Sequence, residues 1–279
     1  MKNIQSKSLL PLIIILFIIG FTTSAKTIFG FSDHNFSDST MDSLSNSALA
    51  ESTIVKNPAH VMFPEVLSEH RDESKDYIKQ YARKQHDFIM FMFSRGKNYF
   101  PKAAKIFTEY DVPTELQMLP ALESNFHADA ISHAGAVGYW QFMSELAHDY
   151  GLRTGAKNDE RKNFTKSTIA AAKFFRDQLN FFNDDLLLAV AAYNCGTGGV
   201  RVAIKKSHVS DPDFWDVKQY LPNETRIFVM KFIALNVISA NYAKFVHHKL
   251  NFNEPTLIQL AFRDSSKSNS DVVLAQNPM

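Results

Sequence analysis

The chain has 279 residues, 45% of them hydrophobic and 13% aromatic, so it can bury a sizeable core. Its 30 basic and 29 acidic residues give a formal net charge of +1, which offers no electrostatic basis for binding nucleic acid. Cys195 is the only cysteine, which excludes an intrachain disulfide. A single thiol of this kind is usually buried and inert.

The N-terminus has the pattern of an export signal. Lys2 and Lys7 form a positive region, and an uncharged, mostly apolar run follows from Leu9 to Phe21. Thr23-Ser24-Ala25 then provides small residues suited to cleavage, and no Cys follows the run that could carry a lipid. The run is shorter than the roughly 20 residues of a membrane-spanning helix. We therefore expect residues 1–25 to be a cleaved signal peptide, with an uncleaved N-terminal anchor as the alternative.

Composition divides the rest of the chain into three parts. Residues 26–60 are rich in Ser, Asp, Asn and Thr and lack hydrophobic periodicity, which is typical of a flexible linker. Residues 61–250 carry the apolar patterning of one domain, and residues 251–279 are expected to form a C-terminal tail.

Helical periodicity dominates the first half of the domain. Apolar residues recur at helical spacing from Asp76 to Phe93, with a break at Gly96, and a second helix is expected from Pro101 to Phe107. Pro113 begins a third helix, and Pro120, inside that helix, should bend it.

The second half of the domain is also predicted to be helical. Further helices are expected over Tyr139–Asp149, Lys166–Asn180, Asp184–Tyr193 with a stop at Gly196, and Pro222 to about Phe245. No alternating strand pattern of useful length precedes residue 272, and no repeat of 20–50 residues is visible. The predicted class is all-α.

Glu123 is the first candidate for chemistry. It lies four residues after Leu119 and seven after Leu116, so on a helix it shares a face with two leucines. A charged carboxylate on an apolar face is costly, so the pKa of such a group rises, and a raised pKa suits a general acid near neutral pH. The commoner alternative, on this evidence alone, is a buried Glu paired with a Lys or Arg.

A glycine-containing segment follows. Gly135 and Gly138 allow the backbone to approach a ligand closely, and Gln141 offers a donor and an acceptor to sugar hydroxyl and acetamido groups. Tyr139 and Trp140 have flat rings of the kind that pair with sugar faces. The alternative is a glycine turn followed by core aromatics. A phosphate-binding loop is not indicated, because neither the GxGxxG spacing nor a Gly-Lys-Ser/Thr sequence is present.

Tyr193 and Asn194 end an apolar helix just before a group of glycines. The simplest interpretation is a helix C-cap and a turn, but a hydroxyl and an amide at such an end can also face a ligand. The ten histidines form no His-Glu-x-x-His motif or Cys/His cluster, so no metal site is expected. No Gly-x-Ser-x-Gly elbow accompanies Ser124 and His127, so a Ser/His pair is not indicated.

Together these segments resemble the soluble lytic transglycosylase (SLT) family, which shares the goose-type lysozyme fold, and in particular its membrane-bound lytic murein transglycosylase D subgroup. The resemblance covers about residues 75–245. The matching motifs are Glu-Ser at Glu123-Ser124, Gly-x-x-Gly-x-x-Gln at Gly135, Gly138 and Gln141, Ala-Tyr-Asn-x-Gly at Ala192 to Gly196, and Leu-Pro-x-Glu-Thr-Arg at Leu221 to Arg226. Asp159-Glu160-Arg161 and Lys166-Ser167-Thr168 also match the subgroup.

The resemblance implies an all-α, lysozyme-like SLT domain that cleaves peptidoglycan glycan strands in a cleft between helices. Glu123 would be the sole acid/base catalyst and would produce 1,6-anhydromuramyl ends. The residues that would hold the sugars and orient the catalyst are Ser124, Gly138, Gln141, Tyr193 and Asn194. No cofactor is implied. The protein would be exported to the bacterial periplasm or cell envelope, with membrane association only through an uncleaved N-terminal segment.

Three departures from the family pattern leave alternatives open. Phe228 replaces a family Tyr and cannot donate a hydrogen bond, which motivates a non-catalytic peptidoglycan-binding or scaffold protein as one alternative. Ser144 replaces a Pro, and the tail is too short for a LysM-type wall-binding repeat. Retaining and inverting glycosidases need two carboxyl groups, and Asp129 or Asp149 could supply the second in a lysozyme-like hydrolase.

Overall fold

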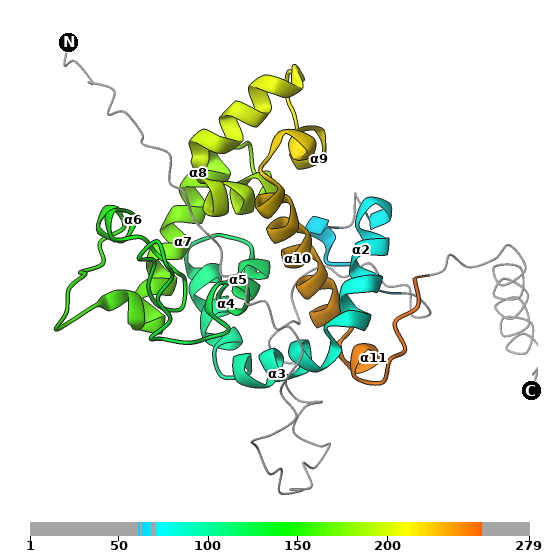
Figure 1. The fold of residues 1–279 in the computed structure, drawn as a ribbon, viewed down its shortest axis with the longest axis horizontal. Helices are drawn as coiled ribbons and strands as arrows, with labels where there is room; N and C mark the ends of the chain where they lie inside the picture. The colour runs from blue at the N-terminus through cyan, green and yellow to red at the C-terminus, as the bar shows by residue number, and fades with distance from the viewer. Residues whose placement is uncertain (1–60, 62, 68–70, 253–279) are drawn as a thin grey trace, which may run out of the picture.

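The computed structural model describes residues 61, 63–67 and 71–252, which form an assembly of helices (Figure 1). Within these residues, strand pairing occurs only as isolated bridges, which include Ile131 with Val137 and Val137 with Phe142. The all-α prediction is therefore confirmed for the described part. The expected signal peptide, linker and nearly all of the tail lie outside the described residues.

The helices follow one another closely along the chain. In order they are η2 (Glu65–Leu67), α2 (Arg71–Lys84), α3 (His86–Gly96), α4 (Phe100–Glu109), η3 (Thr114–Met118), α5 (Leu119–Ser124), α6 (Ser144–Asp149), η4 (Glu160–Lys162), α7 (Phe164–Phe181), α8 (Leu186–Ser207), α9 (Phe214–Val217), η5 (Lys218–Tyr220), α10 (Asn223–Ala240) and α11 (Tyr242–Val246). Helices α4 and α7 confirm the predictions for residues 101–107 and 166–180 to within three residues at each end.

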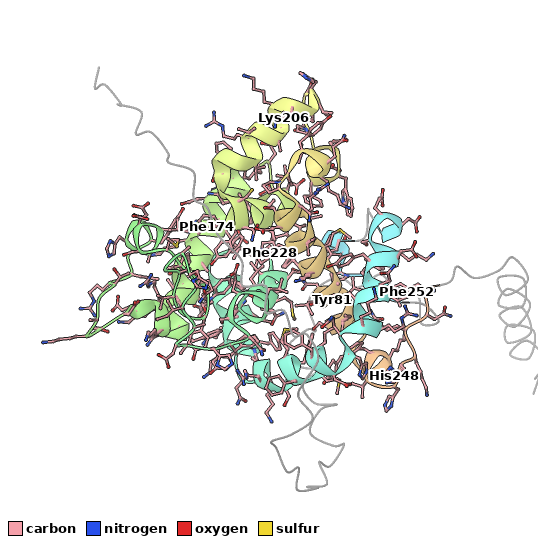
Figure 2. The ribbon with its side chains drawn as sticks, viewed as in Figure 1. Tyr81, Phe174, Lys206, Phe228, His248 and Phe252 are labelled. Carbon is pink, nitrogen blue, oxygen red and sulfur yellow. The ribbon has the colours of Figure 1, made fainter. Side chains whose placement is uncertain are left out.

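Helix α10 lies at the centre of the molecule and packs against α2, α5 and α8 (Figure 1). Its buried residues occur on all sides, which is typical of a helix enclosed by a core. Figure 2 shows Phe228 of this helix near the centre, whereas Lys206 and His248 lie at the edge. Among the described residues, α8 alone is long and apolar enough to cross a membrane, but just over half of its apolar stretch is buried, as in a core helix.

Two predicted helices are each divided in the structure. The helix expected from Asp76 to Phe93 is interrupted at Gln85, whose backbone (φ −115°, ψ 18°) leaves the helical region, so α2 packs on α10 while α3 contacts α5. The helix expected from Pro222 to Phe245 is broken at Asn241. The Asn241 side chain donates to the Val237 carbonyl (2.7 Å), and such local bonding competes with helix continuation.

The prediction that Gly196 ends a helical segment is confirmed by its backbone, since α8 consists of two helical segments that meet in a kink at Gly196. Helix α8 bends there and continues to Ser207, because Gly196 adopts φ 79° and ψ 149°, which lie outside the helical range and favour glycine. Beyond the bend, the Thr197 hydroxyl donates to the Gln178 side-chain oxygen of α7 (2.7 Å). The glycine therefore ends the first helical segment and redirects the chain into the second.

Asp185 joins two helices at the start of α8. One carboxylate oxygen accepts the Leu188 N–H (2.7 Å), which caps α8, and the other accepts the Phe214 N–H at the start of α9 (3.1 Å). Asn163 caps α7 in a simpler way, since its side chain accepts one hydrogen bond, from the Lys166 N–H (3.0 Å).

We expect Asp185→Ala to lower the free energy of unfolding by about 2–3 kcal/mol, because two N–H groups lose their acceptor. Asn163→Ala is the matched control and should cost about 1 kcal/mol, since one N–H is affected. Urea unfolding followed by circular dichroism measures both values. Equal losses would show that the bond to Phe214 contributes nothing.

Candidate active site

Glu123 lies in the last turn of α5. Pro120 occupies the first turn of this helix, where its missing N–H has no hydrogen-bond partner to lose, and the preceding Thr114–Met118 segment is the 3-10 helix η3. The prediction of one helix bent at Pro120 is therefore wrong, because the proline begins a helix. Leu116 and Leu119 are nevertheless fully buried, as the predicted apolar face requires.

The Glu123 carboxyl is held without a charged partner. The residue is half-buried, and within the described part of the chain no hydrogen bond or ion pair reaches its carboxyl. Burial raises its pKa from 4.5 to about 8. The commoner alternative, a buried Glu paired with Lys or Arg, therefore does not describe Glu123. A carboxyl that is mostly neutral at pH 7 can act as a general acid.

The backbone around Glu123 is unusual. Asn125 (φ 49°) and Phe126 (φ 58°), which directly follow α5, and Gln141 (φ 48°) all adopt left-handed conformations. Non-glycine residues in this region are uncommon, and strained backbone of this kind clusters at functional sites. The Phe126 ring stacks on Tyr99 with centroids 5.1 Å apart, so tertiary packing holds the turn in place.

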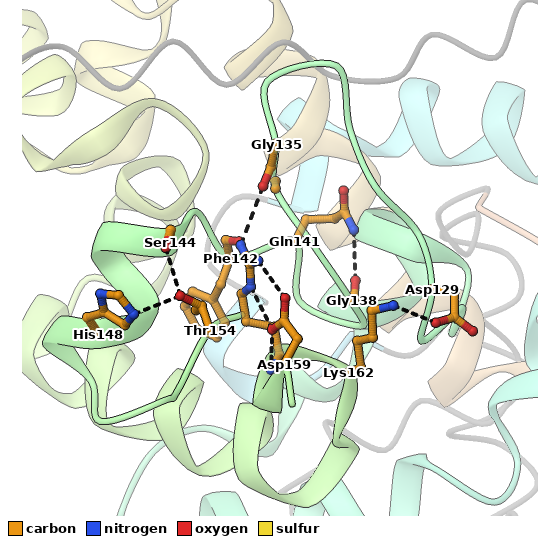
Figure 3. Close-up of polar contacts among 12 residues, drawn as sticks. Asp129, Gly135, Gly138, Gln141, Phe142, Ser144, His148, Thr154, Asp159 and Lys162 are labelled. Atoms are coloured by element: carbon orange, nitrogen blue, oxygen red, sulfur yellow. Dashed lines mark hydrogen bonds and ion pairs between the residues drawn. The ribbon is translucent and has the colours of Figure 1, made fainter. Parts of the chain in front are cut away.

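The segment around Gly138 is a tight loop rather than the start of a helix. The helix predicted from Tyr139 begins only at Ser144, because Gly138 (φ 84°) and Gln141 have positive φ. The Gln141 amide nitrogen donates to the carbonyls of Ala130 (3.1 Å) and Gly138 (2.8 Å), as Figure 3 shows for the second bond. Gln141 therefore closes the loop on itself.

The two aromatic residues of this loop belong to the core. Trp140 is fully buried and donates its indole N–H to the Thr168 hydroxyl (3.0 Å). Tyr139 is also buried, and its hydroxyl lies 3.2 Å from that of Tyr99. The alternative of core aromatics is confirmed for both residues.

A buried arginine supports the loop from behind. The Arg161 guanidinium donates to the carbonyls of Phe142 (2.9 Å) and Gly135 (3.4 Å), and it forms a two-bond ion pair with Asp159 (2.9 and 2.6 Å), as in Figure 3. The Arg161 carbonyl would lie 2.1 Å from a Cβ atom added at Gly138. The sequence marked Asp159 and Arg161 only through the family pattern, because no sequence signal identifies the two carbonyls to which Arg161 donates.

Ser124 and Tyr193 contact the same loop. The Ser124 hydroxyl donates to the carbonyls of Pro120 (3.2 Å) and Tyr139 (2.9 Å), and the Tyr193 hydroxyl donates to the Trp140 carbonyl. Burial, and then the nearby Glu123 charge, raise the pKa of Tyr193. The structure thus brings Ser124 and Tyr193 together at the loop.

Asn194 is the predicted site residue with an unused donor. It is 4% exposed, and its side-chain oxygen accepts a hydrogen bond from the Thr225 hydroxyl (2.8 Å). Its buried side-chain nitrogen has no acceptor. An unsatisfied buried amide is costly, and such groups in a folded protein are candidates for ligand contacts.

The candidates for a second carboxylate are both exposed. Asp129 pairs with Lys162 (2.8 Å), and Asp149 ends α6. Burial is the sole cause of the raised Glu123 pKa, so neither carboxylate contributes to it. Phe228, at the position of the family Tyr, is buried in the core. No group of three or more His, Cys, Asp or Glu side chains in the described ranges could hold a metal ion.

We expect Gly138→Ala to lower the free energy of unfolding by at least about 3 kcal/mol, because the added Cβ meets the Arg161 carbonyl and the positive φ strains alanine. Gly135→Ala is the matched control, since Gly135 has a similar φ of 87° but no atom within 4 Å of its added Cβ. That variant should lose about 1–2 kcal/mol through strain alone. Equal losses in urea unfolding would show that the loop does not depend on this contact.

The segment that carries most of these residues is similar to a known domain. Residues 100–214 match the family model described as Transglycosylase SLT domain. Membrane-bound lytic murein transglycosylase D of Escherichia coli is 34% identical over 179 residues, which are 62% of this chain and 38% of that protein. Membrane-bound lytic murein transglycosylase F of Desulfosudis oleivorans is 35% identical over 115 residues, 38% of this chain and 25% of that protein.

Among solved structures, an inactive mutant of the lytic transglycosylase Slt from Pseudomonas aeruginosa aligns with a TM-score of 0.44 and 19% identity, over 71% of this chain and 41% of that one. The 70 kDa soluble lytic transglycosylase of Escherichia coli aligns with a TM-score of 0.44 and 17% identity, over 68% of this chain and 34% of that one. The chain spans well under half the length of the two curated relatives described above. Residues 100–214 thus match a transglycosylase SLT domain, and the chain is similar to membrane-bound lytic murein transglycosylase D over 62% of its length.

Proposed function

We propose that this protein is a peptidoglycan lytic transglycosylase. Its substrate would be the β-1,4 bond between N-acetylmuramic acid and N-acetylglucosamine, and its product would carry a 1,6-anhydromuramyl end. The observation that carries the proposal is the Glu123 carboxyl, which lies in an SLT domain, lacks a charged partner and has a pKa raised to about 8 by burial.

One carboxyl is enough for this reaction. Neutral Glu123 would donate its proton to the glycosidic oxygen as the bond from that oxygen to C1 breaks. The resulting carboxylate would then take the proton of the muramyl C6 hydroxyl, whose oxygen attacks C1 and closes the anhydro ring. Glu123 returns to its neutral form, and no water is consumed. A retaining or inverting hydrolase would need a second carboxyl group instead.

The other predicted residues divide into two kinds of role. Ser124, Gly138 and Tyr193 would position the loop relative to the acid, since their hydrogen bonds and close contacts are made with the protein backbone. Asn194 and Gln141 would contact the sugars. The unpaired Asn194 side-chain nitrogen supports a donor to an acetamido or hydroxyl oxygen, and the Gln141 side-chain oxygen is available as an acceptor.

The proposed location is the bacterial cell envelope. The relatives are named membrane-bound lytic murein transglycosylases, and murein is found in that compartment. The signal-like residues 1–25 support export to the periplasm, with the N-terminal segment as the means of membrane association if it is not cleaved.

We expect purified peptidoglycan treated with the protein to yield 1,6-anhydromuramyl products, which mass spectrometry identifies. Glu123→Gln should lower the rate by roughly 100- to 10,000-fold, because it removes the transferable proton. Glu115→Gln is the matched control, since Glu115 is a second buried Glu whose pKa burial raises, on η3 rather than in the site.

Other outcomes would contradict this proposal. Products with reducing ends would indicate a lysozyme-like hydrolase. Binding without turnover would indicate a non-catalytic scaffold, the alternative that Phe228 motivates. Full activity of Glu123→Gln would remove Glu123 from the mechanism.

The raised pKa also predicts a dependence of stability on pH. The carboxyl titrates near 8 in the folded chain and near 4.5 when unfolded, so the folded state binds more protons between these values and its stability falls as pH rises through them. Glu123→Gln cannot lose a proton. We expect its Tm to match that of the unsubstituted protein near pH 4 and to exceed it near pH 9, by differential scanning calorimetry. A Tm difference that does not change with pH would show that burial does not shift this group.

A further inference from the structure

Helix α3 presents large apolar side chains to solvent outside the Glu123 site. Phe88 and Phe91 are 48% and 53% exposed, and their three-residue spacing puts them on one side of the helix. The Arg95 guanidinium lies over the Phe91 ring at 4.9 Å from its centroid. Isolated exposed apolar residues are common in soluble proteins, but a pair of phenyl rings on one helix face suggests a contact surface.

The sequence around these rings is basic. From Arg83 to Lys105 there are six Lys and Arg residues and one acidic residue, Asp87, although the 30 basic and 29 acidic residues of the whole chain nearly balance. Arg83 and Lys84 are exposed in the last turn of α2, immediately before α3. We refer to Phe88, Phe91 and Arg95 of α3, together with Arg83 and Lys84 at the adjoining end of α2, as the α3 face.

We propose that the α3 face docks on an anionic phospholipid surface. Phe88 and Phe91 would enter the boundary between headgroups and acyl chains, while Arg83, Lys84 and Arg95 would pair with lipid phosphates. Aromatic rings combined with long basic side chains are the composition that favours this interface. A purely polar anionic partner could pair with the cations, but it would leave the two rings without an apolar environment.

The location of α3 links this surface to other parts of the chain. At one end of α3, the His86 ring stacks on His248 (centroids 3.9 Å apart), and three residues later the Asn251 carbonyl accepts the Val61 N–H (3.1 Å). Val61, the first described residue, is thus hydrogen-bonded close to a residue that packs on α3.

The other end of α3 lies beside the candidate site. Arg95 donates to the Asn125 carbonyl (3.3 Å), in the turn that directly follows Glu123 and Ser124. Docking of the α3 face would therefore hold α5 near the lipid surface. The proposal concerns where the protein works, and it does not depend on the reaction assigned to Glu123.

The test uses tryptophan fluorescence of the full chain with vesicles of phosphatidylethanolamine and phosphatidylglycerol that carry brominated acyl chains. Phe91→Trp places a reporter on the α3 face. Phe181→Trp is the matched control, because Phe181 is equally exposed at 53% but lies on α7, and both variants keep the same N-terminal segment. We expect bromine quenching of the new tryptophan in Phe91→Trp and none in Phe181→Trp.

A second variant tests the charges. Arg83→Gln with Lys84→Gln, added to Phe91→Trp, should weaken docking roughly 20- to 30-fold, since each basic side chain near an anionic surface contributes about 5-fold. High salt and phosphatidylcholine vesicles should weaken it in the same direction. Docking that is unaffected by the charges would contradict the proposed pairing with lipid phosphates.

Several results would overturn the proposal. Equal quenching of the two reporters, or no quenching of Phe91→Trp, would exclude docking through α3. The tryptophan of Phe91→Trp could also be shielded from solvent when no vesicles are present. Shielding that depends on protein concentration would assign the face to a second copy of the chain. Shielding that does not depend on concentration would assign the face to another segment of the same chain. Peptidoglycan cleavage by the same variants is measured without lipid, so a failure of docking is separable from a failure of the proposed activity.

Discussion

The buried guanidinium of Arg161 is the interaction on which the candidate site depends. It comes from a short 3-10 helix, yet it reaches two carbonyls of the loop that contains Gly138 and is neutralised there by Asp159. Desolvation offsets much of what a buried ion pair gains, but removing one partner would leave an uncompensated buried charge and is strongly destabilising. The left-handed conformation of Gln141 and the burial of Trp140 both follow from the loop shape that these bonds fix.

Two glutamates illustrate how surroundings decide the state of the same side chain. Hydrogen bonds from Arg153 and Lys166 lower the pKa of Glu160 to about 2, so it stays charged and serves the framework. Glu123 has no such partner, and burial raises its pKa to about 8. Because the two pKa values are so far apart, Glu160 stays ionised in an ion pair, whereas Glu123 is the carboxyl suited to proton transfer.

Helices whose formation depends on residues within their own turns were predicted more accurately than segments that depend on distant contacts. Helices α4 and α7 were predicted well, because Pro101 and the Ala-rich run at residues 170–172 act within their own turns. The loop at Tyr139 was predicted as helix, because its conformation depends on carbonyl contacts with Arg161. The break at Gly196 was also predictable, because a glycine interrupts a helix through its own backbone.

In the candidate site, too, some features could be predicted from the sequence and others could not. The neutral state of Glu123 was predictable, since Leu116 and Leu119 mark an apolar face whether or not the helix is continuous. The acceptors of the Ser124 hydroxyl and the Gln141 amide were not predictable, because both groups bond to backbone carbonyls rather than to side chains. Sequence motifs identified these residues, and only the structure could show which of their polar atoms remain available. The roles of these residues toward sugars remain predictions.

The bond from Ser124 to the Tyr139 carbonyl has a consequence for motion. It joins the residue next to the acid to the loop that faces it, with α5 on one side and Gly138 on the other. A displacement that separates the turn of the acid from the loop has to break this hydrogen bond. Any widening of the site to admit a polymer would then have to come from elements outside this pair, such as α8 beyond Gly196, while the geometry between proton donor and loop stays constant.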